Sequence, residues 1–106
     1  MKELPNGLLK LVKNYLNYTW LDDATESKLT LMINNAIIDL DDKSGMKNDY
    51  TISGRAQSLL LNRVMYEMSG ALDDFYINYK KEIVAFINKA RVTNAKDQEN
   101  KSMWII

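Results

Sequence analysis

The chain has 106 residues, of which 46% are hydrophobic and 26% are charged, so it fits one ordinary globular domain. Basic and acidic side chains number 14 each. The resulting net charge of zero argues against a general nucleic-acid binder, whose affinity comes mainly from phosphate contacts. The absence of cysteine and histidine excludes disulfides, thiolate zinc sites and most nucleophilic dyads. The sequence shows neither a signal peptide nor an apolar run near the roughly 20 residues that span a bilayer.

Two amphipathic helices are predicted in the N-terminal half. Apolar side chains repeat at helical spacing on one face of residues 7–17. The second helix, residues 24–43, carries an unbroken 3.6-residue stripe and begins near Asp23 and Glu26, which resemble a capping box. Gly45 is expected to end this helix because glycine adopts the left-handed conformation at little cost.

Two further helices are predicted in the C-terminal half, over residues 54–69 and 75–92, again from apolar spacing. Residues 44–53 are expected to form the loop before them, and Met46 and Tyr50 in this loop are predicted to contact other proteins. The predicted fold class is therefore all-α, a small bundle of four helices.

A polar C-terminal arm is expected to follow the bundle. The chain divides into a helical domain over residues 1–92 and an arm over residues 93–106, which is expected to be flexible because its first part is polar and aperiodic. The arm ends in large apolar groups, Met103, Trp104, Ile105 and Ile106. These residues are predicted to dock into a groove on a neighbouring protein, because tryptophan is common among interface hot spots. The alternative is that they fold back onto the chain's own core, and a membrane anchor has the least support.

Two of the predicted helices carry apolar residues on a second face. Leu31 and Ile38 lie seven residues apart on the second helix, and Leu59 and Tyr66 lie seven apart on the third, opposite the main stripes. These residues are predicted to contact another subunit, since a helix with two apolar faces must cover both. The alternative is that the two helices are central in the bundle, or that single exposed apolar residues are ordinary.

Carboxylates are the remaining candidates for chemistry. They cluster at Asp22-Asp23, at Asp39-Asp41-Asp42 and at Asp73-Asp74. Capping or solvated roles fit these positions better, because two clusters lie near predicted helix starts and the third lies in a last helical turn. The sequence contains no phosphate-binding loop, dinucleotide fingerprint or calcium loop. The chain is therefore expected not to be an enzyme, with no catalytic residue, cofactor or metal.

The end of the predicted core resembles a known family. Residues 63–83 are similar to a stretch of the head–tail connector (adaptor) proteins of tailed bacteriophages. There a small residue and Ala-Leu-Asp precede an aromatic residue, an Asn-aromatic pair and an acidic-apolar pair. The matching residues are Gly70-Ala71-Leu72-Asp73, Phe75, Asn78-Tyr79 and Glu82-Ile83. The N-terminal pattern, Leu11 to Leu16 and then the helix from Lys28 to Leu40, is also similar, so the resemblance covers about residues 8–92.

The resemblance implies a structural subunit of the virion neck that assembles in the host cytoplasm. Such subunits form a ring, usually of twelve copies, between the portal and the next neck or tail-completion protein. The ring lines the channel through which DNA passes without specific binding, and the C-terminal segment typically engages the portal. Two rivals stay open. One is a small helical DNA-binding or regulatory protein, although the third predicted helix offers only Arg55 and Arg63. The other is an enzyme that uses carboxylates.

Overall fold

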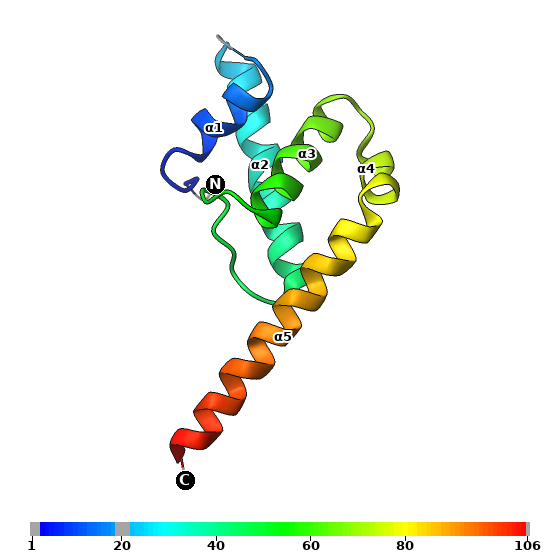
Figure 1. The fold of residues 1–106 in the computed structure, drawn as a ribbon. Coiled ribbons are helices and arrows are strands. Elements are labelled where there is room, and N and C mark those ends of the chain that lie inside the picture. Colours follow the sequence, from blue (N-terminus) through cyan, green and yellow to red (C-terminus); the bar gives the residue numbers. More distant parts are fainter. Residues whose placement is uncertain (1–2, 19–21, 106) are drawn as a thin grey trace.

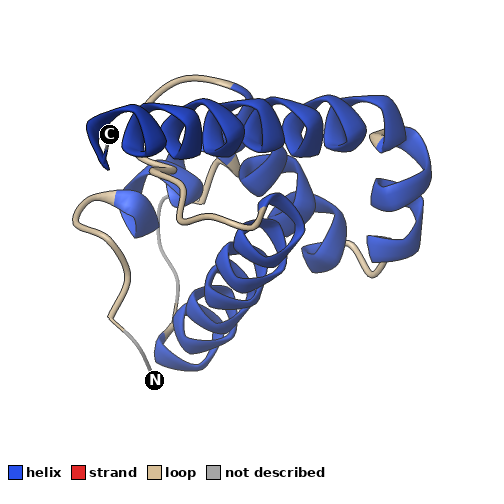
Figure 2. Cartoon of the chain, turned by 90° about the horizontal axis from the view of Figure 1, so that it is seen from below, coloured by secondary structure: helices blue, strands red, loops and turns tan. Residues whose placement is uncertain are grey.

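The computed structural model describes residues 3–18 and 22–105, and the side chains of these residues up to position 93. The described residues form five helices and no strand, which confirms the all-α class but not the count of four helices. The helices are α1 (Leu8–Tyr15), α2 (Asp23–Ser44), α3 (Arg55–Met68), α4 (Leu72–Asn78) and α5 (Lys80–Ile105). Figure 1 shows the first four helices and the start of α5 gathered together, while the rest of α5 leaves them. Seen from below, α5 runs along one side of the molecule and α2 lies at an angle to it (Figure 2).

Helix α2 is the long helix that the apolar stripe predicted. Its N-cap is Asp22, whose Oδ1 accepts a hydrogen bond from the Thr25 backbone N–H at 2.7 Å. Hydrogen bonds from Thr25 also hold the pKa of Asp22 below its ordinary value. The cap was expected at Asp23, and the structure places it one residue earlier, at Asp22. Gly45 ends the helix in the left-handed conformation, with a φ of 73°, as predicted.

The chain between α3 and α5 differs from the prediction of one helix over residues 75–92. Helix α3 ends at Met68, and Gly70 takes a φ of 73°, which turns the chain into α4. Helix α4 is short, and Tyr79 alone separates it from α5. Phe75 is fully buried, so α4 is docked on the core by this side chain before the chain continues into α5.

Helix α5 is longer than the predicted fourth helix. It continues through Ile105, although residues 93–106 were expected to form a flexible arm. This segment contains alanine, lysine, glutamine and glutamate, which favour a helix even where no apolar stripe is present. Apolar periodicity indicates which face of a helix is buried. It therefore predicts where burial ends, near residue 92, and not where the helix itself ends. The described buried residues of α5 stop at Ala90, beyond which α5 extends past the core (Figure 1).

The hydrophobic core is built around α2 and α3. On α2 the predicted stripe is confirmed, because Leu29, Ile33, Ala36 and Leu40 are fully buried. On α3 every residue from Leu59 to Val64 is buried, because α3 packs against α2, α4 and α5. The other segments complete the core with Leu8, Val12, Tyr50, Phe75, Ile83 and Phe86.

A polar cluster joins α2, α3 and α4 and is called here the Asp39 cluster: Asp39, Lys43, Arg63, Glu67 and Tyr76. Asp39 accepts hydrogen bonds from Lys43 Nζ at 2.6 Å and from Tyr76 OH at 2.7 Å. Arg63 donates from Nε to Asp39 at 3.2 Å and from Nη1 to Glu67 at 3.1 Å. Because the Arg63 side chain is buried, these partners compensate for the water that its guanidinium loses.

The Asp39 cluster is expected to make the folded state less stable as the pH falls into the acid range. Burial disfavours the charged form of Asp39. Hydrogen bonds from Lys43 and Tyr76, together with the charges of Lys43 and Arg63, outweigh burial and hold the pKa of Asp39 below its ordinary value of 3.8. A pKa lowered by folding contributes stability that is present above about pH 4 and is lost as the pH falls through the folded-state pKa. Urea titration of the Asp39→Asn variant should therefore show its largest deficit in unfolding free energy near pH 6. That deficit should shrink near pH 3, and an equal deficit at both pH values would contradict this account.

Candidate interaction surfaces

The outer face of α2 carries an exposed apolar strip, defined as Leu31 and Ile38. Leu31 is 46% exposed and Ile38 is 59% exposed, so both face outward as the sequence predicted. Their neighbours on this face, Ser27, Asn35 and Asp42, are polar and exposed. The strip is therefore a narrow apolar feature on a polar surface, and its contact with another subunit stays a prediction.

The two residues predicted as subunit contacts on α3 lie in a different environment. Leu59 is 1% exposed, so the prediction that it faces outward is wrong. Tyr66 is half-buried, and its ring packs edge-on against Phe75 and Tyr79, with centroids 5.9 and 5.8 Å away. Helix α3 is thus a central helix of the bundle, which was the alternative interpretation of its second stripe.

Replacing Leu31 and Ile38 together by glutamine should reduce self-association without unfolding the monomer. Both side chains are about half exposed and outside the core, so the unfolding free energy should change by no more than about 1 kcal/mol. Sedimentation velocity measures the association and urea titration measures the stability, with Asn35→Ala as a control on the same face. Unchanged self-association of the double variant would show that the strip is not a subunit contact. If the double variant is unfolded instead, the two side chains belong to the core.

The loop over residues 45–54 is fixed to the end of α2 by hydrogen bonds. Tyr50 OH donates to Asp41 Oδ1 at 2.7 Å, and Asn48 donates to the same oxygen from its backbone N at 3.2 Å and from Nδ2 at 2.9 Å. Burial, followed by the hydrogen bond to Asp41 and its charge, raises the pKa of Tyr50 far above its ordinary value, so the phenol stays protonated as a donor. Tyr50 is 1% exposed, so the prediction that it contacts another protein is wrong: it anchors the loop.

Replacing Tyr50 by phenylalanine should loosen this loop. The variant keeps the buried ring but removes a hydrogen bond to a charged group, which should cost about 1–2 kcal/mol of unfolding free energy. Hydrogen exchange at the Asn48 and Thr51 amides should accelerate more than exchange in the middle of α2. Equal acceleration at both places would mean that Tyr50 acts on the whole fold rather than on the loop.

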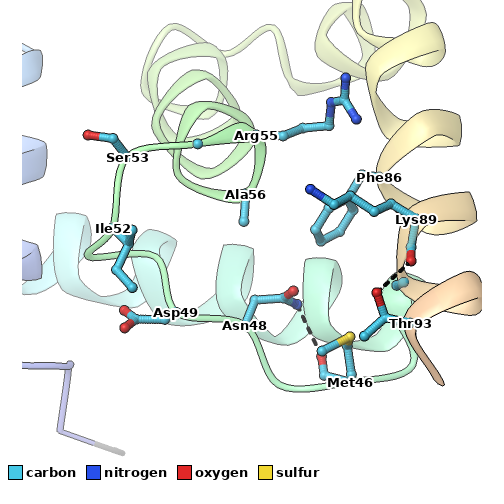
Figure 3. A pocket seen from close by; sticks show the side chains of 12 residues that line it. Met46, Asn48, Asp49, Ile52, Ser53, Arg55, Ala56, Phe86, Lys89 and Thr93 are labelled. Atoms are coloured by element: carbon cyan, nitrogen blue, oxygen red, sulfur yellow. Dashed lines mark hydrogen bonds between the residues drawn. The ribbon is translucent and has the colours of Figure 1, made fainter. Parts of the chain in front are cut away.

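A groove opens between this loop, the start of α3 and the middle of α5 (Figure 3). It encloses about 310 Å³. Its apolar lining comes from Met46, Ile52, Ala56, Phe86 and Ala90. Met46, a predicted partner contact, therefore lies in a real depression of the surface. Ile52 was not predicted, although an isoleucine alone in a polar loop is a usable signal for an exposed contact.

Charged side chains flank the groove. Arg55 and Lys89 line it from α3 and α5, and among the described side chains neither forms an ion pair. Figure 3 shows Lys89 extending from α5 across Phe86 toward α3. Asp49 lines the loop side, where its Oδ1 accepts a hydrogen bond from the Thr51 backbone N–H at 2.9 Å. The groove thus combines an apolar floor with one carboxylate and with two cations that have no ion-pair partner among the side chains described.

The buried position of Arg63 weakens the DNA-binding rival. Its guanidinium is held inside the Asp39 cluster, where it cannot reach a phosphate. Arg55 is then the exposed arginine on α3. A recognition helix needs several basic or polar side chains directed at the grooves and backbone of DNA, and α3 has nearly all of its middle buried.

The predicted carboxylate pair Asp73-Asp74 lies exposed in the first turn of α4. One turn later Ile77 is 71% exposed. In the described part of the chain, no group of three or more carboxylates is placed to hold a metal ion. No helix there combines the length and apolar character that a membrane crossing requires. Asp73, Asp74 and Ile77 thus place two exposed carboxylates beside an exposed apolar side chain on the surface of α4.

No protein-family model matches the chain, and no curated protein or solved structure matches it either. The predicted docking residues Met103, Trp104, Ile105 and Ile106 have side chains outside the described residues, so their docking stays a prediction. The function is therefore inferred from the chain's own residues and their arrangement.

Proposed function

We propose that this chain is a structural head–tail connector subunit in the neck of a tailed phage. Its copies form a ring, of twelve in the family it resembles, between the portal and the next neck or tail protein. The observation that carries the proposal is helix α5, which runs on from the last described buried residue, Ala90, to Ile105. At 1.5 Å per residue this is roughly 22 Å of helix beyond the core. A helix that leaves its own core in this way is suited to contact other polypeptides.

The residues that carry the family resemblance form the corner from which α5 starts. Gly70 supplies the left-handed turn after α3, and Phe75 holds α4 on the core. Tyr79 stacks on Phe75 with centroids 5.1 Å apart, at the junction of α4 and α5. These residues therefore set the direction in which α5 leaves the bundle, which gives the resemblance a physical meaning for a connector.

Charge also fits a conduit for DNA. The chain has a formal net charge of zero, and the one arginine in the middle of α3 is internally paired. A channel that must let DNA pass benefits from weak phosphate contacts, because each strong contact adds to a salt-dependent affinity that would retain the DNA. The proposal accordingly includes no enzymatic activity, no cofactor and no specific DNA site.

The proposal is tested by deleting the gene from the phage or prophage genome that carries it. Electron microscopy of the resulting lysate should show heads and tails that accumulate separately, and the full chain supplied in trans should join them. A chain truncated after Ser102 should fold, by circular dichroism, but join them poorly, because the predicted docking residues are missing. Normal tailed particles from the deletion strain, or a gene that lies apart from any portal or capsid gene, would contradict the proposal.

A further inference from the structure

Helix α4 presents a surface that we name the α4 knob: Ile77 with Asp73 and Asp74. The two aspartates precede Ile77 by four and three residues, so the three side chains share one face of the helix. Ile77 is 71% exposed, and both aspartates are exposed without an ion pair among the described side chains. The α4 knob is thus an apolar side chain with two carboxylates beside it.

The groove between the loop, α3 and α5 has the complementary character. Its floor of Ala56 and Phe86 is apolar, and Arg55 and Lys89 stand beside that floor without ion-pair partners among the described residues. The match extends further along the chain. The exposed Lys80 and Lys81 follow the knob, and the groove carries the carboxylate of Asp49. The two surfaces are therefore complementary in charge as well as in apolar character.

The α4 knob cannot enter the groove of its own chain. Ile77 precedes Phe86 by nine residues and Ala90 by thirteen. Phe86 and Ala90 lie six and ten residues beyond Lys80, the first residue of α5, whereas Ile77 lies in α4, before that end of α5. At 1.5 Å per residue the groove side chains of α5 are therefore roughly 9–15 Å along its axis from the end at which α4 joins it. A second copy of the chain is needed to bring the two surfaces together.

We infer that the α4 knob of one copy docks in the groove of the next, so that copies associate head to tail. Ile77 covers the floor at Ala56 and Phe86, and the aspartates approach Arg55 and Lys89. Because the two surfaces differ, the contact is heterologous and repeats from copy to copy, closing into a ring or extending as a chain. Closure into a ring rests on the proposed function, whereas the contact itself does not.

The absence of cysteine allows a clean cross-linking test with the full chain. One preparation carries Ala56→Cys and the other carries Ile77→Cys, and the two are mixed and oxidised. The mixture should give a disulfide-linked heterodimer in at least several-fold higher yield than Ala56→Cys mixed with Asn14→Cys, an exposed residue on α1 that lies in none of the proposed contacts. A single chain with both Ala56→Cys and Ile77→Cys should give a ladder of trimers and larger species.

Charge reversal provides the specific control. Adding Asp73→Lys and Asp74→Lys to the Ile77→Cys chain should lower the heterodimer yield about three- to tenfold, the range expected for two exposed ion pairs. Adding Arg55→Glu and Lys89→Glu to the Ala56→Cys chain should restore it. All these positions except Ala56 are exposed, and circular dichroism confirms folding before each mixture.

Three results would overturn the inference. The first is a heterodimer yield no higher than that of the Asn14→Cys pair. The second is a double-cysteine chain that stops at dimers, which indicates a two-fold exchange instead of a head-to-tail repeat. The third is a higher yield for Ala56→Cys with Trp104→Cys, which places the C-terminal segment of a second copy in the groove. Each of these leaves the gene-deletion result unaffected, so the failure of the contact is distinguishable from the failure of the connector function.

Discussion

Replacing Phe75 by alanine is expected to lower the free energy of unfolding by about 3–5 kcal/mol, the usual loss for a buried aromatic residue. Phe75 is fully buried, and its ring contacts those of Tyr66, Tyr76 and Tyr79, with centroids 5.1–5.9 Å apart. The loss includes both the transfer of the ring from water and the cavity left among the three tyrosines. Urea titration followed by circular dichroism measures it.

Ile77→Ala is the matched control, because it removes a large apolar side chain from the same short helix. Ile77 is 71% exposed, so the unfolding free energy should change by only about 0.5 kcal/mol. The expected contrast between the two variants is therefore several kcal/mol. Similar losses in both would mean that α4 is not docked on the core by Phe75.

Replacing Arg63 by alanine should lower the unfolding free energy by about 2–4 kcal/mol. This is slightly less than the 3–5 kcal/mol typical of breaking a fully buried ion pair, because Asp39 keeps some exposure. The variant leaves Asp39 with Lys43 and Tyr76 only, and it removes the link between α2 and α3. Arg63→Lys should recover part of the loss, because lysine restores a charge but not the forked donor geometry.

Arg55→Ala is the control for this variant, since Arg55 is an exposed arginine on the same helix without an ion pair among the described residues. Its unfolding free energy should stay within about 0.5 kcal/mol of the wild type. If Arg55→Ala and Arg63→Ala were equally destabilising, the effect would come from helix propensity or net charge and not from the Asp39 cluster.

Apolar periodicity predicted burial best for helices that bury only one face. Helix α2 shows this: its main stripe is in the core, and Leu31 and Ile38 on its opposite face are exposed, as predicted. On helix α3 a second apolar stripe does not mark an exposed face, because α3 packs against α2, α4 and α5. Its second stripe indicates a central position, so Leu59 is a core residue. Periodicity alone cannot separate these two cases.

The C-terminal end of α5 and the groove could not be predicted from the sequence, for two different reasons. Helix continues past Ala90 because of local propensity, whereas the predicted boundary at residue 92 followed the loss of an apolar face. The groove joins a loop, α3 and α5, which are far apart in the sequence, so no local pattern predicts it. Tyr50 was misjudged because its hydrogen bond to Asp41 depends on how the loop folds back onto α2.

The most direct test of the connector proposal is cryo-electron microscopy of the neck of the tailed particles to which the proposal assigns this chain. We expect a ring of copies between the portal and the next neck or tail protein. In that ring the part of α5 beyond Ala90 should contact another protein, and Ile77 should lie in the groove of the adjacent copy. A neck whose density is fully accounted for by other proteins, with this chain absent from the purified particle, would contradict the account.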